Sequence, residues 1–371
     1  MVKGALLLLM YLLPACNQAN ETPSYPIVAL IMASVDADYQ LREVKIDSLT
    51  NINTMTGIYG SIKGQAALNL DVQMEEILAS TDPSGVYSNR GQAVKTDYLL
   101  QNGIVIPQNF QTMEMLGLYY AYQQTLRFWI KNFDLPIEKI GFPQLYFNPK
   151  MLSHKNGEQI EVSTTMNAAY LPSVRDFWFF KTAAKERVPV KMNFGIIAHE
   201  FAHFAFDYYF AELNRDNYSA KFHLNEFFLS GLNEGLADYL SFVATGSVLE
   251  FRASLPTLDA QRRLPVPWTL KSILSSPCSG TFYCEGSVLA SSLYEIAQTL
   301  DPTGISVAKT VIGALGPFRK EWLLHRDVDY LDYSSLLNPI LDAAGNDRAS
   351  YCLSFKKWFD TENVRLKLAC T

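Results

Sequence analysis

Two histidines four residues apart, with a glutamate directly after the first, stand out in the stretch GIIAHEFAHF at residues 195–204. On an α-helix, positions four apart lie on the same face, so the imidazoles of His199 and His203 can meet at one ion. Zinc takes nitrogen ligands at about 2.0–2.1 Å in tetrahedral geometry. Glu200 lies one residue further round the helix, where its carboxylate can reach a water on the metal and act as a general base. The spacing predicts a hydrolytic zinc site; the competing interpretation is a pair of partly buried histidines hydrogen-bonded to neighbours.

The segment GLNEGLADYLS, at residues 231–241, offers a third ligand. Glu234 and Asp238 share one face if the segment is helical, and the leucines beside them argue against a solvated helix face. Glu234 can then bind the ion, while Asp238 accepts the other ring N–H of a ligand histidine and fixes its tautomer. Glu226 is the competing ligand, but it has no carboxylate four residues later, which favours Glu234.

These two segments together resemble the active-site sequence of gluzincin metallopeptidases, and within them the thermolysin-like and fungalysin-like families. The resemblance is carried by HEFAH at residues 199–203 and NEGLAD at residues 233–238. It implies one Zn²⁺ cofactor with three protein ligands: His199, His203 and Glu234. It also implies that Glu200 is the base that deprotonates the attacking water.

Further segments carry the same resemblance, which covers about residues 110–300 in all. An Asp-Tyr pair follows the second histidine, as in the family, and residues 285–300 resemble the helix behind the primed side of the site. Asn167-Ala168-Ala169-Tyr170 resembles the edge strand that pairs with a substrate backbone, so Asn167 and Ala168 are implied to hold the main chain of a peptide substrate. The residues implied to support the ligands from behind are Asp207, Asn233 and Asp238.

The chain departs from thermolysin-like enzymes at the residue that stabilises the oxyanion. Those enzymes have a histidine near the start of the downstream helical region, whereas this chain has no histidine between His223 and His325. Tyr283 can donate a phenolic O–H in that place, as tyrosines do in other gluzincins. The alternatives are that Tyr283 is a packed aromatic, that His223 takes the role, or that the missing histidine marks a slow or narrowly specific enzyme.

The expected function is therefore zinc-dependent hydrolysis of internal bonds in a peptide or protein substrate. A zinc aminopeptidase is disfavoured, because gluzincin aminopeptidases hold the substrate amine with a Gly-x-Met-Glu-Asn segment. The nearest string here, at residues 165–168, has no glutamate. The other alternative is a non-catalytic envelope protein that keeps the fold as a binding scaffold. The missing oxyanion histidine favours that alternative, whereas the presence of the base and all three ligands opposes it.

The N-terminus has the pattern of an export signal. Lys3 precedes an apolar run over residues 5–13 that is too short to span a bilayer and is typical of a signal h-region. Leu13-Pro14-Ala15-Cys16 resembles a bacterial lipobox. It implies a signal peptide over residues 1–15, lipidation of Cys16, and a lipid-anchored tether over residues 16–25. The expected location is the bacterial cell envelope, at the outer membrane or periplasmic face; an ordinary secretory signal would instead give a secreted protein.

The expected fold is α+β: a thermolysin-like two-lobed metallopeptidase with a mixed sheet, an edge strand and an active-site helix, then a mainly helical lobe. A small β-rich region over residues 26–107 precedes a catalytic domain over residues 108–371. In the β-rich region, strands are expected at 27–32, 43–46 and 58–62. Further on, the apolar spacing predicts a helix at 110–132, strands at 144–147, 159–164 and 176–180, and helices from residue 193, with loops at 251–268 and 275–283.

The composition of 49% hydrophobic and 18% charged residues is that of a well-packed globular protein. The net charge is −6 and no basic run is present, so no nucleic-acid partner is expected. Apart from Cys16, an even number of cysteines in an exported chain suggests disulfides. Of the three connectivities, Cys278–Cys284 with Cys352–Cys370 is favoured because each pair closes a short loop. Reduced thiols on an apolar face are the alternative.

Overall fold

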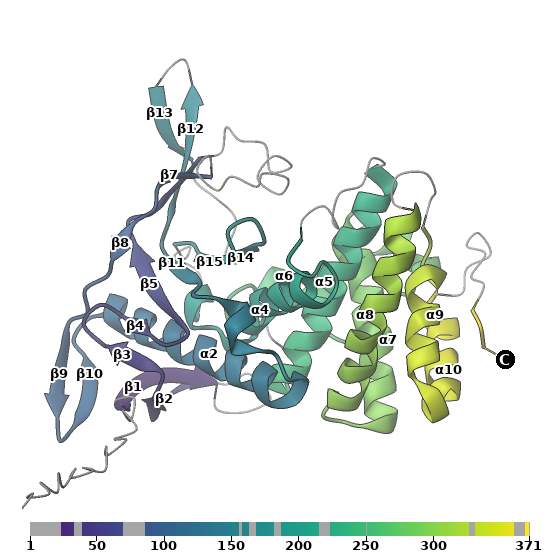
Figure 1. The fold of residues 1–371 in the computed structure, drawn as a ribbon, viewed down its shortest axis with the longest axis horizontal. Helices are drawn as coiled ribbons and strands as arrows, with labels where there is room; N and C mark the ends of the chain where they lie inside the picture. Colours follow the sequence, from purple (N-terminus) through teal and green to yellow (C-terminus); the bar gives the residue numbers. More distant parts are fainter. Residues whose placement is uncertain are drawn as a thin grey trace, which may run out of the picture.

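The computed structural model describes residues 24–32, 39–69, 86–155, 158–162, 168–181, 187–214, 223–249, 251–325, 331–359 and 368–370. Strands gather at one end of the molecule together with α2 (Phe110–Phe133), and most of the other helices lie at the opposite end, with α4 (Phe194–Tyr209) between them (Figure 1). The expected signal peptide, Cys16 and Asn167 lie outside the described residues. Within the described ranges, no helix combines the length and the apolar character that crossing a membrane requires.

The strands form three sheets. The first has the order β2-β1-β10-β9, the second β14-β15-β11-β5-β4-β3 with β8 beside β5, and the third β13-β12-β6-β7. β14 forms an edge of the second sheet, with β15 as its paired neighbour. The bounds are β1 (Tyr25–Met32), β2 (Tyr39–Ile46), β3 (Leu49–Asn51), β4 (Thr56–Gly57), β5 (Gly60–Gly64), β6 (Ala67–Asn69), β7 (Tyr87–Asn89), β8 (Gln92–Ala93), β9 (Tyr98–Gln101), β10 (Ile104–Pro107), β11 (Gln144–Phe147), β12 (Lys150–Lys155), β13 (Glu158–Val162), β14 (Ala168–Leu171) and β15 (Asp176–Phe179).

The helices follow mainly in the second half of the chain, which confirms the expected α+β class with a helical C-terminal part. The 3₁₀ helices are η2 (Val190–Met192), η4 (Leu270–Ser275) and η5 (Gly345–Asp347). The α-helices besides α4 are α2 (Phe110–Phe133), α3 (Ile137–Ile140), α5 (His223–Thr245), α6 (Pro256–Arg262), α7 (Phe282–Leu300), α8 (Ile305–His325), α9 (Ser334–Ala343) and α10 (Arg348–Phe359).

Local sequence signals explain where two of these helices begin. The long helix predicted over residues 110–132 is α2, and the side chain of Asn109 caps it by accepting a hydrogen bond from Thr112 N at 2.8 Å. The loop predicted over residues 251–268 is wrong in part, because α6 lies inside it. Pro256 stands in the first turn of α6, where its fixed φ suits a helix and its missing N–H has no intrahelical partner to lose.

The β-rich region before residue 107 shares two sheets with the region after it. β5 pairs in parallel with β11, with Ile62 opposite Leu145, and β6 pairs in parallel with β12, with Leu68 opposite Met151. The second and third sheets therefore continue across the change in secondary structure near residue 107. Strands β5 and β6 are positioned by partners from the second region, whereas the β2-β1-β10-β9 sheet is built from the first region alone.

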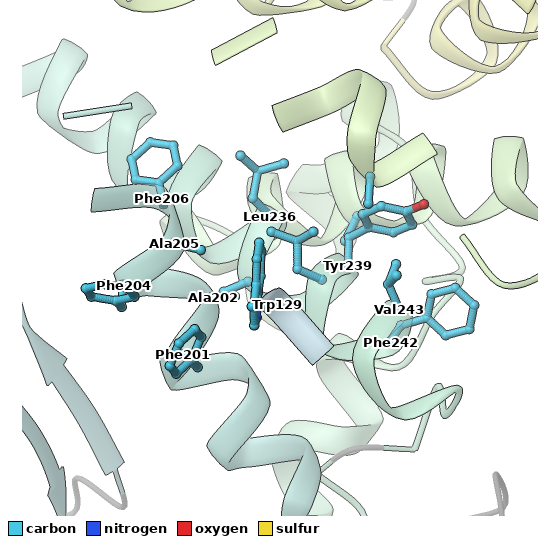
Figure 2. Packing of buried hydrophobic residues seen from close by; sticks show 14 of the residues in the cluster. Trp129, Phe201, Ala202, Phe204, Ala205, Phe206, Leu236, Tyr239, Phe242 and Val243 are labelled. Atoms are coloured by element: carbon cyan, nitrogen blue, oxygen red, sulfur yellow. The ribbon is translucent and has the colours of Figure 1, made fainter. Parts of the chain in front are cut away.

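The helix that carries the two histidines is packed on several sides. The ring of Phe201 stacks on Phe177 of β15, with centroids 5.9 Å apart and planes within 5° of parallel. The ring of Trp129, from α2, lies 6.2 Å from that of Phe201. Figure 2 shows apolar side chains of α2, α4 and α5 gathered in one cluster. Such packing holds the backbone of α4 in a fixed position relative to the sheet and to α5.

A buried ion pair joins α2 to the segment just before α4. Lys191 Nζ lies 3.3 Å from Glu114 Oε1, and the two side chains are 2% and 9% exposed. Nζ also donates a hydrogen bond to Asn148 Oδ1 at 2.6 Å. Burial raises the pKa of Glu114, and Lys191 offsets part of that rise. These contacts tie α2, the turn after β11 and η2 together, and so fix the start of α4.

Asp176 joins three strands of the β-rich part. Its carboxylate accepts hydrogen bonds from Gln144 N and from the hydroxyl of Tyr87, each at 2.7 Å. Burial raises the pKa of Asp176 to about 6, although the two hydrogen bonds act in the opposite direction. The folded protein therefore holds a proton on this carboxyl more tightly than an unfolded chain does.

This raised pKa gives the stability of the protein a defined pH dependence. The contribution of Asp176 is complete below about pH 4, where an unfolded aspartate is also protonated, and is lost as the pH rises through 6. The side chain of an Asp176→Asn variant stays neutral at every pH. We therefore expect the free energy of unfolding of the wild type, minus that of the variant, to fall by about 2–3 kcal/mol between pH 4 and pH 7. Urea unfolding of both proteins across this range measures the difference. A constant difference would contradict the raised pKa.

Both favoured disulfides are present. Cys278 is bonded to Cys284, with Cα atoms 5.5 Å apart, and Cys352 is bonded to Cys370, with Cα atoms 5.7 Å apart. The first disulfide closes the segment that leads into α7, and the second ties the last described residues to α10.

Candidate metal centre

The start of α4 is fixed by its cap. The side chain of Asn193 accepts hydrogen bonds from Gly195 N at 3.0 Å and Ile196 N at 3.4 Å, which satisfies two amides that have no partner within the helix. The same oxygen accepts a hydrogen bond from the hydroxyl of Tyr39 at 2.9 Å, and Asn193 Nδ2 donates to Ser254 Oγ. The cap thus links the helix to β2 and to the segment before α6.

His199, His203 and Glu234 converge, with one ligand atom from each within 4.8 Å of the others. The Nε2 atoms of the two histidines are 3.1 Å apart. His199 Nε2 is 3.4 Å from Glu234 Oε2, and His203 Nε2 is 3.8 Å from Glu234 Oε1. The competing ligand Glu226 is not part of this group, so the structure brings together the three residues that the sequence predicts.

A second layer of polar groups orients both imidazoles. His203 Nδ1 is 3.0 Å from the side-chain oxygen of Asn233, and His199 Nδ1 is 3.1 Å from Asp238 Oδ1. When Nδ1 carries the proton, Nε2 presents its lone pair to the space between the rings and Glu234. Asn233 and Asp238 thus lie where the sequence predicts support for the ligands. Burial alone would lower the pKa of His199, but the carboxylates of Asp238 and Glu234 outweigh it and raise that pKa to about 10.

These three residues fit a zinc ion. Tetrahedral nitrogen and oxygen ligands at about 2.0–2.1 Å from zinc lie about 3.3 Å from one another. The observed separations of 3.1, 3.4 and 3.8 Å differ from that value by a few tenths of an ångström. Two neutral imidazoles with one carboxylate are also a donor set that zinc prefers, and it leaves the fourth position for water or substrate.

Arg262 is the residue at this centre that the sequence did not reveal. Its buried guanidinium donates to both oxygens of Asp238, at 2.9 and 2.6 Å, and to Glu234 Oε2 at 2.7 Å. This cation lowers the pKa of Glu234 well below its usual range, in spite of burial. Two buried carboxylates require a cation, which is the signal that could have pointed to an arginine. Arg262 falls within the segment that was predicted to be a loop.

Glu200 is held against the edge strand. Its carboxylate Oε2 accepts a hydrogen bond from the backbone N–H of Tyr170, in β14, at 2.8 Å. Backbone groups two residues apart on a strand point the same way, so those of Ala168 face the same side as this N–H. Asp207 contacts the same strand, because it accepts a hydrogen bond from the hydroxyl of Tyr170 at 2.7 Å. It therefore supports β14.

Tyr283 lies beside the carboxylates and Arg262, in the first turn of α7. Its ring is 4.9 Å from the guanidinium carbon of Arg262, and 39% of the residue is exposed. Burial raises the pKa of Tyr283 to about 12, with further contributions from Glu234 and Glu200. The phenol is therefore protonated at neutral pH and can donate a hydrogen bond. The ring also packs against that of Phe282, with centroids 4.3 Å apart, so the alternative of a packed aromatic is decided by the kinetics of a variant.

The helices that carry Glu234 and Tyr283 touch through their backbones. A Cβ added to Gly235 of α5 would lie 2.3 Å from the carbonyl oxygen of Gly286 in α7. A Cβ added to Gly286 would lie 2.6 Å from the carbonyl oxygen of Gly231. Only glycine allows this approach, so the pair of glycines sets the distance between the third ligand and the phenol.

Comparisons with known proteins give a distant structural similarity only. No protein-family model matches the sequence, and no curated protein matches it. Among solved structures, the precursor of protealysin, a metalloproteinase from Serratia proteamaculans, is 13% identical with a TM-score of 0.43. That similarity covers 85% of this chain and 92% of that chain. The functional interpretation therefore rests on the geometry of the metal centre itself.

Proposed function

We propose that this chain is a zinc-dependent endopeptidase. The observation that carries the proposal is the convergence of His199, His203 and Glu234, with Glu200 held beside them by the edge strand. A zinc ion bound by the three ligands supplies Lewis acidity, which acidifies a water and polarises the scissile carbonyl. The base and the ligands come from two different helices that pack on each other, as a preorganised site requires.

The residues of the chain then have distinct tasks. The outer edge of β14 binds the main chain of the substrate as an added strand, through Ala168 and its neighbour Asn167. Glu200 takes the proton of the attacking water and passes it to the leaving amine. The backbone N–H of Tyr170 orients the carboxylate of Glu200 for that transfer. The phenol of Tyr283 donates a hydrogen bond to the oxygen on which negative charge develops.

The proposal is tested with the protein from residue 17 onward and a Glu200→Gln variant, which keeps the size of the side chain but removes the base. Both proteins are loaded with zinc, the bound metal is counted, and both are incubated with a mixed-sequence peptide library read by mass spectrometry. We expect about one zinc in each protein and internal cuts by the wild type alone. If both proteins bound zinc and neither cut any peptide, the non-catalytic binding scaffold would be favoured. If the wild type only removed residues from the N-termini of the peptides, an aminopeptidase would be favoured.

Replacing Tyr283 with phenylalanine tests its role as the oxyanion donor. Removal of one such donor costs about 100-fold in kcat, so we expect a loss of that order with zinc content unchanged. Steady-state kinetics on a peptide cut by the wild type gives kcat and KM separately. Since the substitution removes only the hydroxyl, an unchanged kcat would assign Tyr283 to packing beside Arg262.

We also propose that the protein is anchored to the cell envelope through a lipid on Cys16. The lipobox-like sequence at residues 13–16 and the polar tether that follows support this location. A peptidase on a short tether acts on substrates near the membrane surface. Incorporation of a labelled fatty acid by the wild type but not by Cys16→Ser would support the anchor, and equal labelling of both would refute it.

A further inference from the structure

A second cleft lies on the face of the β14–β3 sheet that is turned away from α4. It has a volume of about 690 Å³ and is lined by residues of β5, β11 and β15, by the segment around β7, and by the turn between β14 and β15. The side chains that matter here are Lys63, Arg90, Arg175, Tyr87, Tyr146 and Asp176. This cleft shares no lining residue with the metal centre.

The cleft is positively charged on a chain whose net charge is −6. It contains three cations, Lys63, Arg90 and Arg175, and one carboxylate, that of Asp176. Asp176 is already engaged by Gln144 and Tyr87, and no ion pair within the described ranges involves any of the three cations. The guanidinium of Arg175 donates one hydrogen bond to Leu213 O at 3.3 Å, and that of Arg90 lies 5.7 Å from the ring centroid of Tyr87. These neutral partners leave the positive charges without a counter-ion, so the field of the cleft favours an anionic ligand.

Two local features of the β14–β15 turn also point to a ligand. Arg175 has a φ of 56°, in the left-handed region that a residue with a Cβ rarely adopts. Backbone strain of this kind persists where the surrounding structure holds it, often at binding sites. Ser173 Oγ is buried and has no hydrogen-bond partner in the part of the chain that the structure describes. This unsatisfied hydroxyl beside a charged cleft can donate a hydrogen bond to a ligand that binds there.

The turn connects the cleft to the strand at which a substrate is proposed to bind. β14 ends at Leu171, and the turn that follows returns through Arg175, whose backbone N–H donates to Leu171 O at 2.8 Å. Glu200 contacts Tyr170, one residue before the end of β14. A peptide that lies along β14 and continues past Leu171 therefore reaches the turn a few residues away from the bond that is cut.

We propose that this cleft is a subsite for acidic side chains of the peptide substrate, several residues from the scissile bond. Arginine guanidinium groups bind carboxylates through two parallel hydrogen bonds, so Arg90 and Arg175 suit aspartate or glutamate, with Lys63 as a further cation. The aromatic rings of Tyr87 and Tyr146, 5.2 Å apart, form an apolar wall beside the charges. This inference rests on the proposed endopeptidase function and specifies its substrate class.

The kinetic test uses two peptides that differ only in glutamate or glutamine at positions three to six residues from the cut. For the wild type we expect kcat/KM to be at least about tenfold higher for the acidic peptide, through a lower KM. Arg90→Gln/Arg175→Gln is expected to lose that preference with kcat unchanged. Lys309→Gln, an exposed charge on α8, is the matched control and should keep the preference. A preference that survives in the double variant, or is absent from the wild type, would overturn the subsite.

A binding test separates failure of the subsite from failure of the endopeptidase proposal. Fluorescence anisotropy of the labelled acidic peptide is measured with the Glu200→Gln variant, which carries out no turnover. Binding that is weakened about tenfold by Arg90→Gln/Arg175→Gln supports the subsite even if the wild type cuts nothing. Equal binding of the glutamate and glutamine peptides would overturn it.

Discussion

Arg262→Met is expected to destabilise the metal-free protein by about 3 kcal/mol or more, because it removes the buried guanidinium that bridges Asp238 and Glu234 and leaves only His199 as a cation beside these two carboxylates. Arg262 donates to Asp238 and to Glu234, and the side chain of Asp238 is 1% exposed. Zinc brings two positive charges to Glu234, so metal binding should restore part of the lost stability. We therefore expect the melting temperature of the variant to rise more on addition of zinc than that of the wild type.

The neighbouring arginine provides the control for this experiment. Arg263 carries the same charge one residue later but is exposed, so Arg263→Met should change stability by less than about 0.5 kcal/mol and leave the response to zinc as in the wild type. Thermal unfolding of the wild type and the two variants, each with zinc and with a chelator, gives the stability differences and the response of each protein to zinc. If the two variants behaved alike, Arg262 would have no special role in balancing the charge of the centre.

Gly286→Ala is expected to be the most damaging of the conservative changes. Its Cβ would lie 2.6 Å from Gly231 O and 2.8 Å from Gly235 N, and backbone atoms cannot move aside as a flexible side chain can. The two helices must separate, which we expect to cost about 3 kcal/mol of stability. The displacement also moves Glu234 away from the histidines, so affinity for zinc should fall by at least about tenfold, since altered ligand support typically costs that much.

A glycine elsewhere in a helix distinguishes this effect from a general effect of the substitution. Gly313 lies within α8, and a Cβ added there meets nothing within 4 Å. Gly313→Ala should therefore stabilise the protein, by about 0.5–1 kcal/mol, and leave zinc affinity unchanged. Chemical unfolding and zinc titration of both variants test the pair. Equal stability of the two variants would mean that the α5–α7 contact is looser than the structure indicates.

The candidate metal ligands could be predicted from sequence because their spacing is local. His199 and His203 need only one helix to meet, and Asp238 lies on the same helix face as Glu234. Arg262 could not be predicted in the same way, since its contacts depend on how α6 packs against α5. Two arginines stand side by side at residues 262–263, and nothing in their spacing shows which one turns inward.

The limits of prediction for the sheets have a similar cause. Alternation and turn residues located strand segments such as β1, β11 and β15, but pairing between distant strands has no local signature. The parallel pairing of β5 with β11 depends on the whole chain between them, so residues 26–107 were expected to form a region of their own. Likewise, the contact of Asp207 with Tyr170 depends on where β14 lies against α4, which no local pattern reveals.

The parallel pairings also determine the order in which the protein can fold as it is synthesised. β1 pairs with β2, the next strand in the sequence, but its parallel partner β10 lies roughly 80 residues later. β5 and β6 are separated from their parallel partners β11 and β12 by a similar number of residues. High contact order of this kind slows folding, because loop closure precedes the favourable contacts. The first sheet can be complete once residue 107 is available, whereas the third needs residue 162 and the second needs residue 179. A shorter nascent chain exposes unpaired edges of β5 and β6, which favours early binding by a chaperone.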